Sequence, residues 1–497
     1  MPISTHLIHF MRAEHISIRN SRSGERWQGA LLLFLGLDAS LHHLVGFAMV
    51  NLSVPVMKQK LRMIILPFLF LAAPAMAEVR GACLLSTLVP ESATASTRTP
   101  ERAFSAFDFI NSIGVNTHLN YFDRTYGNFA LVENELRSIG IRHVRDGAHL
   151  QNADYNKMLY GRWIELGKIG IRFDVVLDPR SRLGPLTPAL LAQIDDLSGH
   201  TVESFEGANE LDISNMSGWQ AVDRGFQHEI YSASRTLANE RHIRVIAPSL
   251  AFVAHGQAFN GSLEGFDYGN LHPYPAGKMP SVVFPEQTEL AQRVFAGKPI
   301  VITESGYHNA MNDHHDQPAV SEQAAAKYIN RLFLENFSRG IPRTYLYELL
   351  DEAPDPGLAD NQMHWGLVRA DGTEKPAFVA LKRLIAELHD SAEPASPKQL
   401  TWSLSEPQRT IHHLLLQKTN GELDLVLWQE VPSYDVREQR DIANPPEKTV
   451  LNLGQTARLV TLYEPVLQEA PLKSLAHTAS VPLEIPDHPL VVAIDLK

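Results

Sequence analysis

Short apolar runs alternate with amphipathic helical patterns from about Phe107 to Asp390, and this alternation restricts the possible folds more than any other feature. Gly140, Gly170 and Gly340 each stand just before a run, where they are typical stop signals for a preceding helix. Eight strand and helix units over roughly 285 residues predict a (β/α)8 barrel. The predicted strands are Ile113–Leu119, His143–Asp146, Arg172–Leu177, Val202–Glu206, Arg244–Pro248, Tyr268–His272, Ile300–Glu304 and Thr344–Leu349.

A doubly wound open sheet is the alternative, since it also alternates strands with helices. No predicted strand leads into a GxGxxG or Walker A loop, and this favours the barrel. After Pro397 helical patterns stop and strand patterns follow one another, with Asn420-Gly421 as a hairpin signal. We therefore expect a (β/α)8 barrel over residues 107–395 and an all-β sandwich over residues 396–497.

The first 77 residues have the features of an export signal. Lys58, Lys60 and Arg62 precede the apolar run Met63–Ala73, and Ala75-Met76-Ala77 offers a small-x-small cleavage site. We expect a signal peptide at 57–77, an upstream extension at 1–56, a loosely ordered lead-in at 78–106 and a secreted or periplasmic protein. The alternative is a membrane anchor at residues 30–50. Asp38, His42 and His43 within that run disfavour it, so no stable membrane insertion is expected.

The net charge disfavours one class of partner, and the cysteine content excludes two kinds of structural feature. The 497 residues have a net charge of -12, so the surface repels phosphate backbones and nucleic acid is not an expected partner. The single cysteine, Cys83, excludes an intrachain disulfide framework and a cysteine-built metal cluster. No cofactor is expected.

Two glutamates stand at the ends of predicted barrel strands, where the functional side chains of such barrels lie. Glu210 follows the fourth strand in the dipeptide Asn209-Glu210, and Glu304 ends the seventh. Two facing carboxyl groups are the apparatus that cleaves a glycosidic bond, one as acid and the other as nucleophile. The alternative is a pair of structural acids.

Several motifs occur in the order seen in one group of enzymes. They are Gly114-Val115-Asn116-Thr117-His118, Val144-Arg145-Asp146, Asn270-Leu271-His272-Pro273-Tyr274 and Gly366-Leu367-Val368-Arg369. With Asn209-Glu210 and Glu304, they make the chain resemble the retaining glycoside hydrolases of clan A. The resemblance is closest to family 39, in which a β-sandwich follows the barrel, and extends to family 5.

The resemblance implies roles for individual residues. Glu210 is the expected acid/base, Glu304 the nucleophile, and Asn209 the partner of the sugar 2-hydroxyl. Arg145 is expected to lower the pKa of Glu304, and Tyr274 to donate a hydrogen bond to it. His118 and His272 are expected to line the pocket. Many clan members carry a tryptophan on strand eight, where this chain has Tyr347, so Tyr347 or Trp365 is expected to stack on the sugar, with Tyr307 as a further platform.

Other polar residues near the predicted site are expected to have no catalytic or metal-binding role. Glu203 and Glu206 are expected to be buried ion-pair partners. The cluster after Glu304 is expected to be a solvated loop without a metal; it comprises His308, Asp313, His314, His315 and Asp316. The expected function is hydrolysis of a polysaccharide or oligosaccharide, and the alternatives are a transglycosylase and a non-catalytic carbohydrate-binding protein. Trp402 and Trp428 are expected in the core of a sandwich that braces the barrel.

Overall fold

The computed structural model describes residues 96–148, 153–181, 186–261, 263–314, 317–406 and 409–496, which belong to one compact unit. The expected upstream extension and signal peptide lie outside the described residues, as do His315 and Asp316. Among the described helices, none has the length and apolar character that crossing a membrane requires.

The predicted barrel is confirmed. Its parallel sheet has 8 strands in the order β7-β6-β5-β4-β3-β10-β9-β8, and the parallel bridge between Ile246 and Tyr268 brings the two ends together. All eight predicted strands are present, with shorter bounds at most C-terminal ends. They are β3 (Ile113–Asn116), β4 (His143–Gly147), β5 (Arg172–Val176), β6 (Val202–Glu206), β7 (Arg244–Ile246), β8 (Gly269–Leu271), β9 (Ile300–Ser305) and β10 (Thr344–Leu346).

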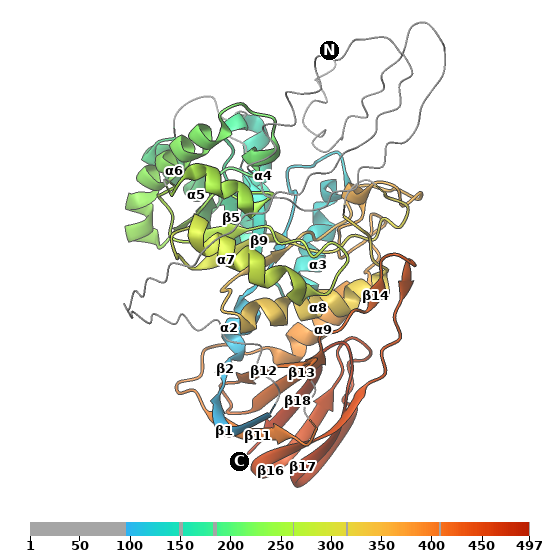
Figure 1. Cartoon of the computed structure of the whole chain (residues 1–497). Helices are drawn as coiled ribbons and strands as arrows, with labels where there is room; N and C mark the ends of the chain where they lie inside the picture. The colour runs from blue at the N-terminus through green and yellow to red at the C-terminus, as the bar shows by residue number, and fades with distance from the viewer. Residues whose placement is uncertain are drawn as a thin grey trace, which may run out of the picture. The chain divides into compact units, whose positions relative to one another are not determined.

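Helices follow the strands around the barrel (Figure 1). Local signals define their ends: the Ser321 hydroxyl accepts from the Ala324 amide to cap α8, and Gly140 ends α3 with a φ of 83° that favours glycine. The helices are α2 (Ala106–Asn111), α3 (Phe129–Ile139), α4 (Ala153–Gly167), α5 (Pro188–Leu197), α6 (Trp219–Arg241), α7 (Phe284–Val294), α8 (Glu322–Ser338) and α9 (Pro376–Leu388).

The predicted all-β domain is also confirmed. Its strands are β11 (Gln399–Leu404), β12 (Ile411–Gln417), β13 (Leu423–Gln429), β16 (Glu447–Tyr463), β17 (Lys473–Ile485) and β18 (Leu490–Asp495), with a small hairpin of β14 (Tyr434–Asp435) and β15 (Arg440–Asp441). β16 is one long strand that shifts register between Asn452 and Ala457. The first part of β16 pairs with β11 and the second with β18, so the sheet folds over a shared apolar core.

Residues 96–105 differ from the loose lead-in expected there. β1 (Ser96–Arg102) pairs with β11, and β2 (Phe104–Ser105) pairs with β12 at the other end of the same sheet. The Glu101 carboxylate accepts the Trp402 indole N–H at 2.8 Å. This segment therefore closes the C-terminal sheet, and its Ser- and Thr-rich composition concealed a strand that is stabilised by distant partners.

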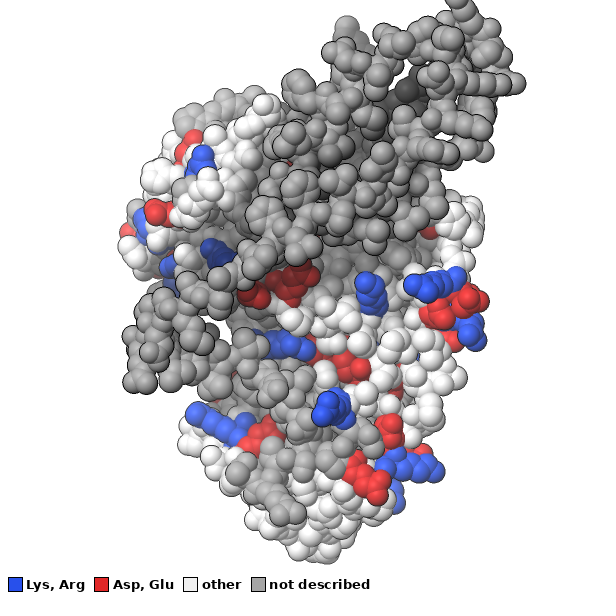
Figure 2. Space-filling view, viewed as in Figure 1, with Lys and Arg blue, Asp and Glu red and all other residues white. Residues whose placement is uncertain are grey.

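The barrel and the C-terminal sheet share a buried interface. In Figure 1, α8 and α9 lie beside the strands β12, β13 and β18. Side chains of these strands alternate between two cores: Leu425 and Leu427 face the sheet's own core, while Val426 and Trp428 belong to the barrel cluster. On the described surface visible in Figure 2, Lys and Arg side chains are interspersed with Asp and Glu.

Candidate active site

The carboxyl ends of β6 and β9 bring Glu210 and Glu304 together. A parallel bridge between Asn209 and Ser249 extends the β6 side of the sheet, and Glu210 then takes a left-handed backbone conformation with a φ of 48°. This conformation is uncommon for a residue other than glycine and is concentrated at functional sites. One carboxylate oxygen of Glu210 and one of Glu304 lie within 4.8 Å of each other. The two carboxyl groups therefore face one another, as expected.

Arg145 on β4 fixes the positions of the surrounding acceptors. Its Nε and Nη2 donate to the two carboxylate oxygens of Glu206 at 2.7 and 2.8 Å. Its Nη1 donates to Glu304 Oε1 at 2.6 Å and to Asn116 Oδ1 at 2.9 Å, and its Nη2 also donates to Asn209 Oδ1 at 2.8 Å. A fork of this kind holds several oxygens rigidly. The expected ion-pair role of Glu206 is confirmed.

Glu304 is held as a carboxylate. The Tyr274 hydroxyl donates to its Oε2 at 2.8 Å, the contact expected from the sequence. Burial by itself would raise the pKa of Glu304, but His272, Arg145 and Tyr274 outweigh burial and lower it. An ionised carboxylate in a mostly dry site is suited to act as a nucleophile.

His272 joins the two glutamates. Its Nδ1 lies 2.7 Å from Glu210 Oε1 and 3.6 Å from Glu304 Oε2. Burial would lower the pKa of His272, yet the charges of Glu304 and Glu210 raise it above its ordinary value. The Glu210 side chain is 20% exposed, so its carboxyl group reaches the open side of the site.

Asn209 is oriented by its carbonyl oxygen. Oδ1 accepts from Arg145 Nη2 and, at 3.1 Å, from the Ser249 hydroxyl. Because Oδ1 makes both of these contacts, the amide NH2 group of Asn209 is left as a donor. The described contacts include no protein acceptor for this group. The group is suited to donate to a ligand hydroxyl.

Comparison with known proteins finds the fold of this chain among solved glycosidase structures. No protein-family model and no curated protein sequence matches the chain. Among solved structures, a glucosidase from Croceicoccus marinus aligns with a TM-score of 0.50 at 11% identity, covering 73% of this chain and 91% of that one. The GH39 enzyme from Xanthomonas axonopodis pv. citri aligns with a TM-score of 0.50 at 16% identity, covering 82% of this chain and 100% of that one. The chain has the fold of this GH39 enzyme. The fold expected from the resemblance to family 39 is therefore confirmed.

Aromatic rings line one side of the site in this GH39-type barrel. Tyr347 hydrogen-bonds His118 Nε2 at 3.0 Å, and the Trp365 ring lies 5.1 Å from that of Tyr274 and 6.0 Å from that of Tyr347. Burial lowers the pKa of His118 to about 4, so its ring is neutral at neutral pH. The structure thus brings His118, Tyr347 and Trp365 into one wall next to Tyr274.

Tyr307 lies outside this aromatic wall. Its ring stacks on Tyr328 of α8 at 5.0 Å, and its hydroxyl donates to the Lys278 carbonyl at 2.8 Å. The side chain is buried in the barrel cluster, so it supports the loop after β9 and does not offer a surface to a sugar. His308 from the same loop is buried as well, with Nε2 2.6 Å from the Gln317 carbonyl, and is not part of a solvated cluster.

Three groups of described side chains lie close enough to share an ion. They are His118, Glu348 and Glu352; Asp195, Asp196 and His200; and Glu210, His272 and Glu304. Each group is already in contact with a guanidinium, from Arg124, Arg241 and Arg145 respectively. A divalent cation would have to compete with these arginines.

Three buried polar residues of the site were not predicted as site residues, although Asn116 and Asn270 stand within the motifs that carry the resemblance. Asn116 accepts from Arg145, Asn270 donates to Glu206 Oε1 at 3.0 Å, and Thr303 lies 2.9 Å from His272 Nε2. All three are on barrel strands, directly beside or close to predicted site residues. Asn116 and Asn270 offered a signal, as amide side chains in otherwise apolar strands, whereas Thr303 did not, because β-branched residues are common in strands.

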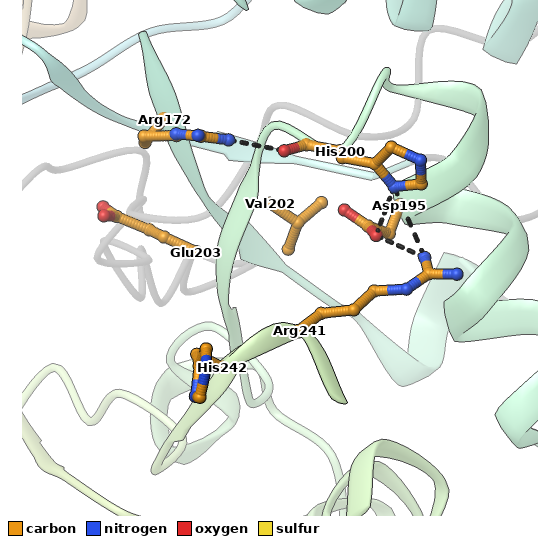
Figure 3. Close-up of a pocket in the computed structure, with 7 residues that line it drawn as sticks. All are labelled: Arg172, Asp195, His200, Val202, Glu203, Arg241 and His242. Carbon is orange, nitrogen blue, oxygen red and sulfur yellow. Dashed lines mark hydrogen bonds and ion pairs between the residues drawn. The ribbon is translucent and has the colours of Figure 1, made fainter. Parts of the chain in front are cut away.

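A separate cavity of about 520 Å³ opens where β5 and β6 begin, at the opposite ends of the strands (Figure 3). Arg172 donates there to the His200 carbonyl, and Arg241 and His200 both contact Asp195. These side chains satisfy one another and stabilise the base of the barrel.

Proposed function

We propose that the protein is a retaining glycoside hydrolase that acts on a polysaccharide or oligosaccharide. Glu304 attacks the anomeric carbon, while Glu210 donates a proton to the glycosidic oxygen of the leaving group. Glu210 then removes a proton from water, whose oxygen displaces Glu304 from the same carbon. Asn209 donates to the sugar 2-hydroxyl, and Tyr347 and Trp365 flank the ring.

The separation of the two carboxyl groups carries this proposal. Inverting enzymes hold their carboxyl groups roughly 6.5–9.5 Å apart to admit a water molecule, whereas retaining enzymes hold them about 5–5.5 Å apart. One carboxylate oxygen of Glu210 and one of Glu304 lie within 4.8 Å of each other, which is too close for the wide gap of an inverting site. The site therefore favours direct attack by Glu304.

The test is hydrolysis of a panel of aryl glycosides and polysaccharides by the wild type and by Glu304→Gln and Glu304→Ala. We expect both variants to lose about 10³-fold or more of the wild-type activity. Glu133→Gln, at a partly exposed position of α3, is the matched control. Full activity in both Glu304 variants would refute the assignment.

The anomeric configuration of the first product, followed by NMR, tests retention. Retention supports attack by Glu304, and inversion would overturn it. Products longer than the substrate in the presence of acceptor sugars would indicate a transglycosylase. Binding without turnover across the panel would indicate a carbohydrate-binding protein.

We also propose that the protein is exported, with cleavage after Ala77. The basic and apolar pattern from Lys58 to Ala77 supports this. N-terminal sequencing of the protein purified from the expressing cells' medium or periplasm should begin at Glu78.

A further inference from the structure

A chain of buried hydrogen bonds fixes where the protons lie around His272. It begins at Glu206, whose two carboxylate oxygens accept hydrogen bonds from Nε and Nη2 of Arg145. An ionised carboxylate acts only as an acceptor. Asn270 Nδ2 contacts Glu206 Oε1 at 3.0 Å and the Ala247 carbonyl at 3.2 Å. Both partners are acceptors, so the Asn270 amide nitrogen faces them and its Oδ1 faces the other way.

Thr303 takes its orientation from this amide. Thr303 Oγ1 lies 2.7 Å from Asn270 Oδ1, and that contact requires the single hydroxyl proton of Thr303. Its longer contact of 3.2 Å with Glu206 Oε1 competes for the same proton. The lone pairs of Oγ1 remain for His272 Nε2, 2.9 Å away. Nε2 of His272 therefore carries a proton.

The charges around His272 favour a second proton on the ring. The ionisable groups that act on it are Glu210 after β6, Glu206 on β6, Glu304 on β9 and Arg145 on β4, while the Tyr274 hydroxyl donates to Glu304. Three carboxyl groups against one guanidinium leave an excess of negative charge when the carboxyl groups are ionised. An imidazolium at this position reduces that excess, and its Nδ1–H points at Glu210 Oε1.

We propose that Thr303 is a positioning residue that accepts from His272 Nε2–H and so holds His272 as the imidazolium that donates to Glu210. This inference rests on the proposed function for its catalytic meaning. When Glu210 transfers its proton to the leaving oxygen, the resulting carboxylate remains paired with a cation. The same cation is present when Glu210 later takes a proton from water, so His272 keeps both of its protons through both steps.

The protonation state of His272 can be measured without a substrate. In protein labelled with ¹⁵N-histidine, the signals of His272 are identified by their loss in His272→Gln. We expect both ring nitrogens to be protonated at pH 7 in the wild type and in Thr303→Ser. In Thr303→Val, the titration of His272 should move down by about one pH unit or more, because a hydrogen bond to a charged donor is lost.

Thr201→Val controls for removing a buried threonine hydroxyl elsewhere, since Thr201 bonds the Ser198 carbonyl at the base of the barrel. An unprotonated Nε2 in the wild type at pH 7 would overturn the proposal, even if Thr303→Val did not fold. An unchanged titration in Thr303→Val would also overturn it.

The pH profile of the aryl glycosidase activity gives a second readout. Loss of the imidazolium removes a positive charge beside both glutamates, so both limbs should move to higher pH in Thr303→Val. Thr303→Ser should restore the wild-type profile. A lower rate with an unchanged profile would show a merely structural role. A wild type without glycosidase activity would refute the proposed function and leave the NMR result standing.

Discussion

Arg145 uses every donor that its side chain has. A guanidinium carries five N–H groups, and five hydrogen bonds join this one to Glu206, Glu304, Asn209 and Asn116. The side chain is 5% exposed and that of Glu206 is fully buried. The same residue therefore compensates a buried charge and aligns the proposed nucleophile.

Arg145→Met should lower the free energy of unfolding by about 3–5 kcal/mol, because it leaves the Glu206 charge buried without its partner. Urea unfolding at pH 7 measures this. Arg137→Met is the matched control, since it removes an exposed pair with Glu133 and should cost about 0.5 kcal/mol or less. Equal losses in the two variants would contradict the assigned role.

At the scale of single residues, the sequence predicted site residues near the ends of barrel strands but missed those inside the strands. Glu210 and Glu304 could be placed because functional side chains follow barrel strands, whereas the roles of Arg145 and Tyr274 were implied by the resemblance to family 39. Thr303 could not be placed, because a threonine inside a strand is ordinary β-branched packing until its hydrogen-bond partners on other strands are known. Tyr307 lies in the expected loop, but its ring packs on α8 and not toward the site.

At the scale of elements, β13 is buried on both faces, and Asp424 is the charged residue within it. Lys418 Nζ approaches its carboxylate at 3.3 Å, yet burial raises the pKa of Asp424 to about 7. A raised pKa means that the folded protein retains a proton on this side chain that the unfolded chain releases near pH 4.

This residue should make stability depend on pH. The stabilisation that protonated Asp424 gives the folded state is fully present below the pKa that Asp424 has in the unfolded chain. This stabilisation is lost as the pH rises through about 7, the pKa of Asp424 in the folded protein. Relative to Asp424→Asn, the wild type should therefore lose up to about 4 kcal/mol between pH 4 and pH 8. Urea unfolding across this range measures the difference. Asp196→Asn, at an exposed position, is the control, and parallel curves for wild type and Asp424→Asn would contradict the prediction.

The strand β1 is attached through Glu101, which also contacts His413 Nε2 at 3.1 Å. Glu101→Ala removes a charged acceptor from Trp402 and His413, so we expect a loss of about 1–3 kcal/mol in the free energy of unfolding. Glu101→Gln keeps an acceptor and should lose less. Equal unfolding curves for Glu101→Ala and wild type would show that β1 adds nothing through this contact.

The strand patterns after Pro397 predicted an all-β domain, but β1 lies before the barrel, where a loosely ordered lead-in was expected. Side chains of β12 and β13 face two cores, and those of β11 face the core of the C-terminal sheet alone. β17 is mostly exposed before Val481 and pairs only with β16 among the described strands, so its buried apolar residues are confined to Val481, Leu483 and Ile485 at its end. Its strand conformation depends on its neighbour.

At the scale of the whole molecule, Arg331 of α8 connects the barrel to the C-terminal sheet. Its buried guanidinium pairs with Glu430 at 2.9 Å and donates to the carbonyls of Val431 and Asp487, each at 3.0 Å. On the same helix, Glu335 accepts from the Trp428 indole at 3.0 Å. The expected bracing role of the sheet remains a prediction, which these contacts support.

Arg331→Met should separate the unfolding of the two parts. We expect one calorimetric transition in the wild type and an earlier, broader or split transition in the variant, because Glu430 is left buried without its cation. Arg293→Met, which removes an exposed pair with Glu289 on α7, is the control. An unchanged single transition in Arg331→Met would show that Arg331 does not couple the barrel and the sheet.

The closure of the C-terminal sheet by β1 has a consequence for biosynthesis. Glu101 and Trp402 are 301 residues apart in the chain. At ribosomal rates of about 5–20 residues per second, β1 is made roughly 15–60 s before its partner strand. During this interval its unpaired edge is open to pairing with other chains. The order of synthesis therefore means that β1, the first of the described strands to be made, is among the last to be paired.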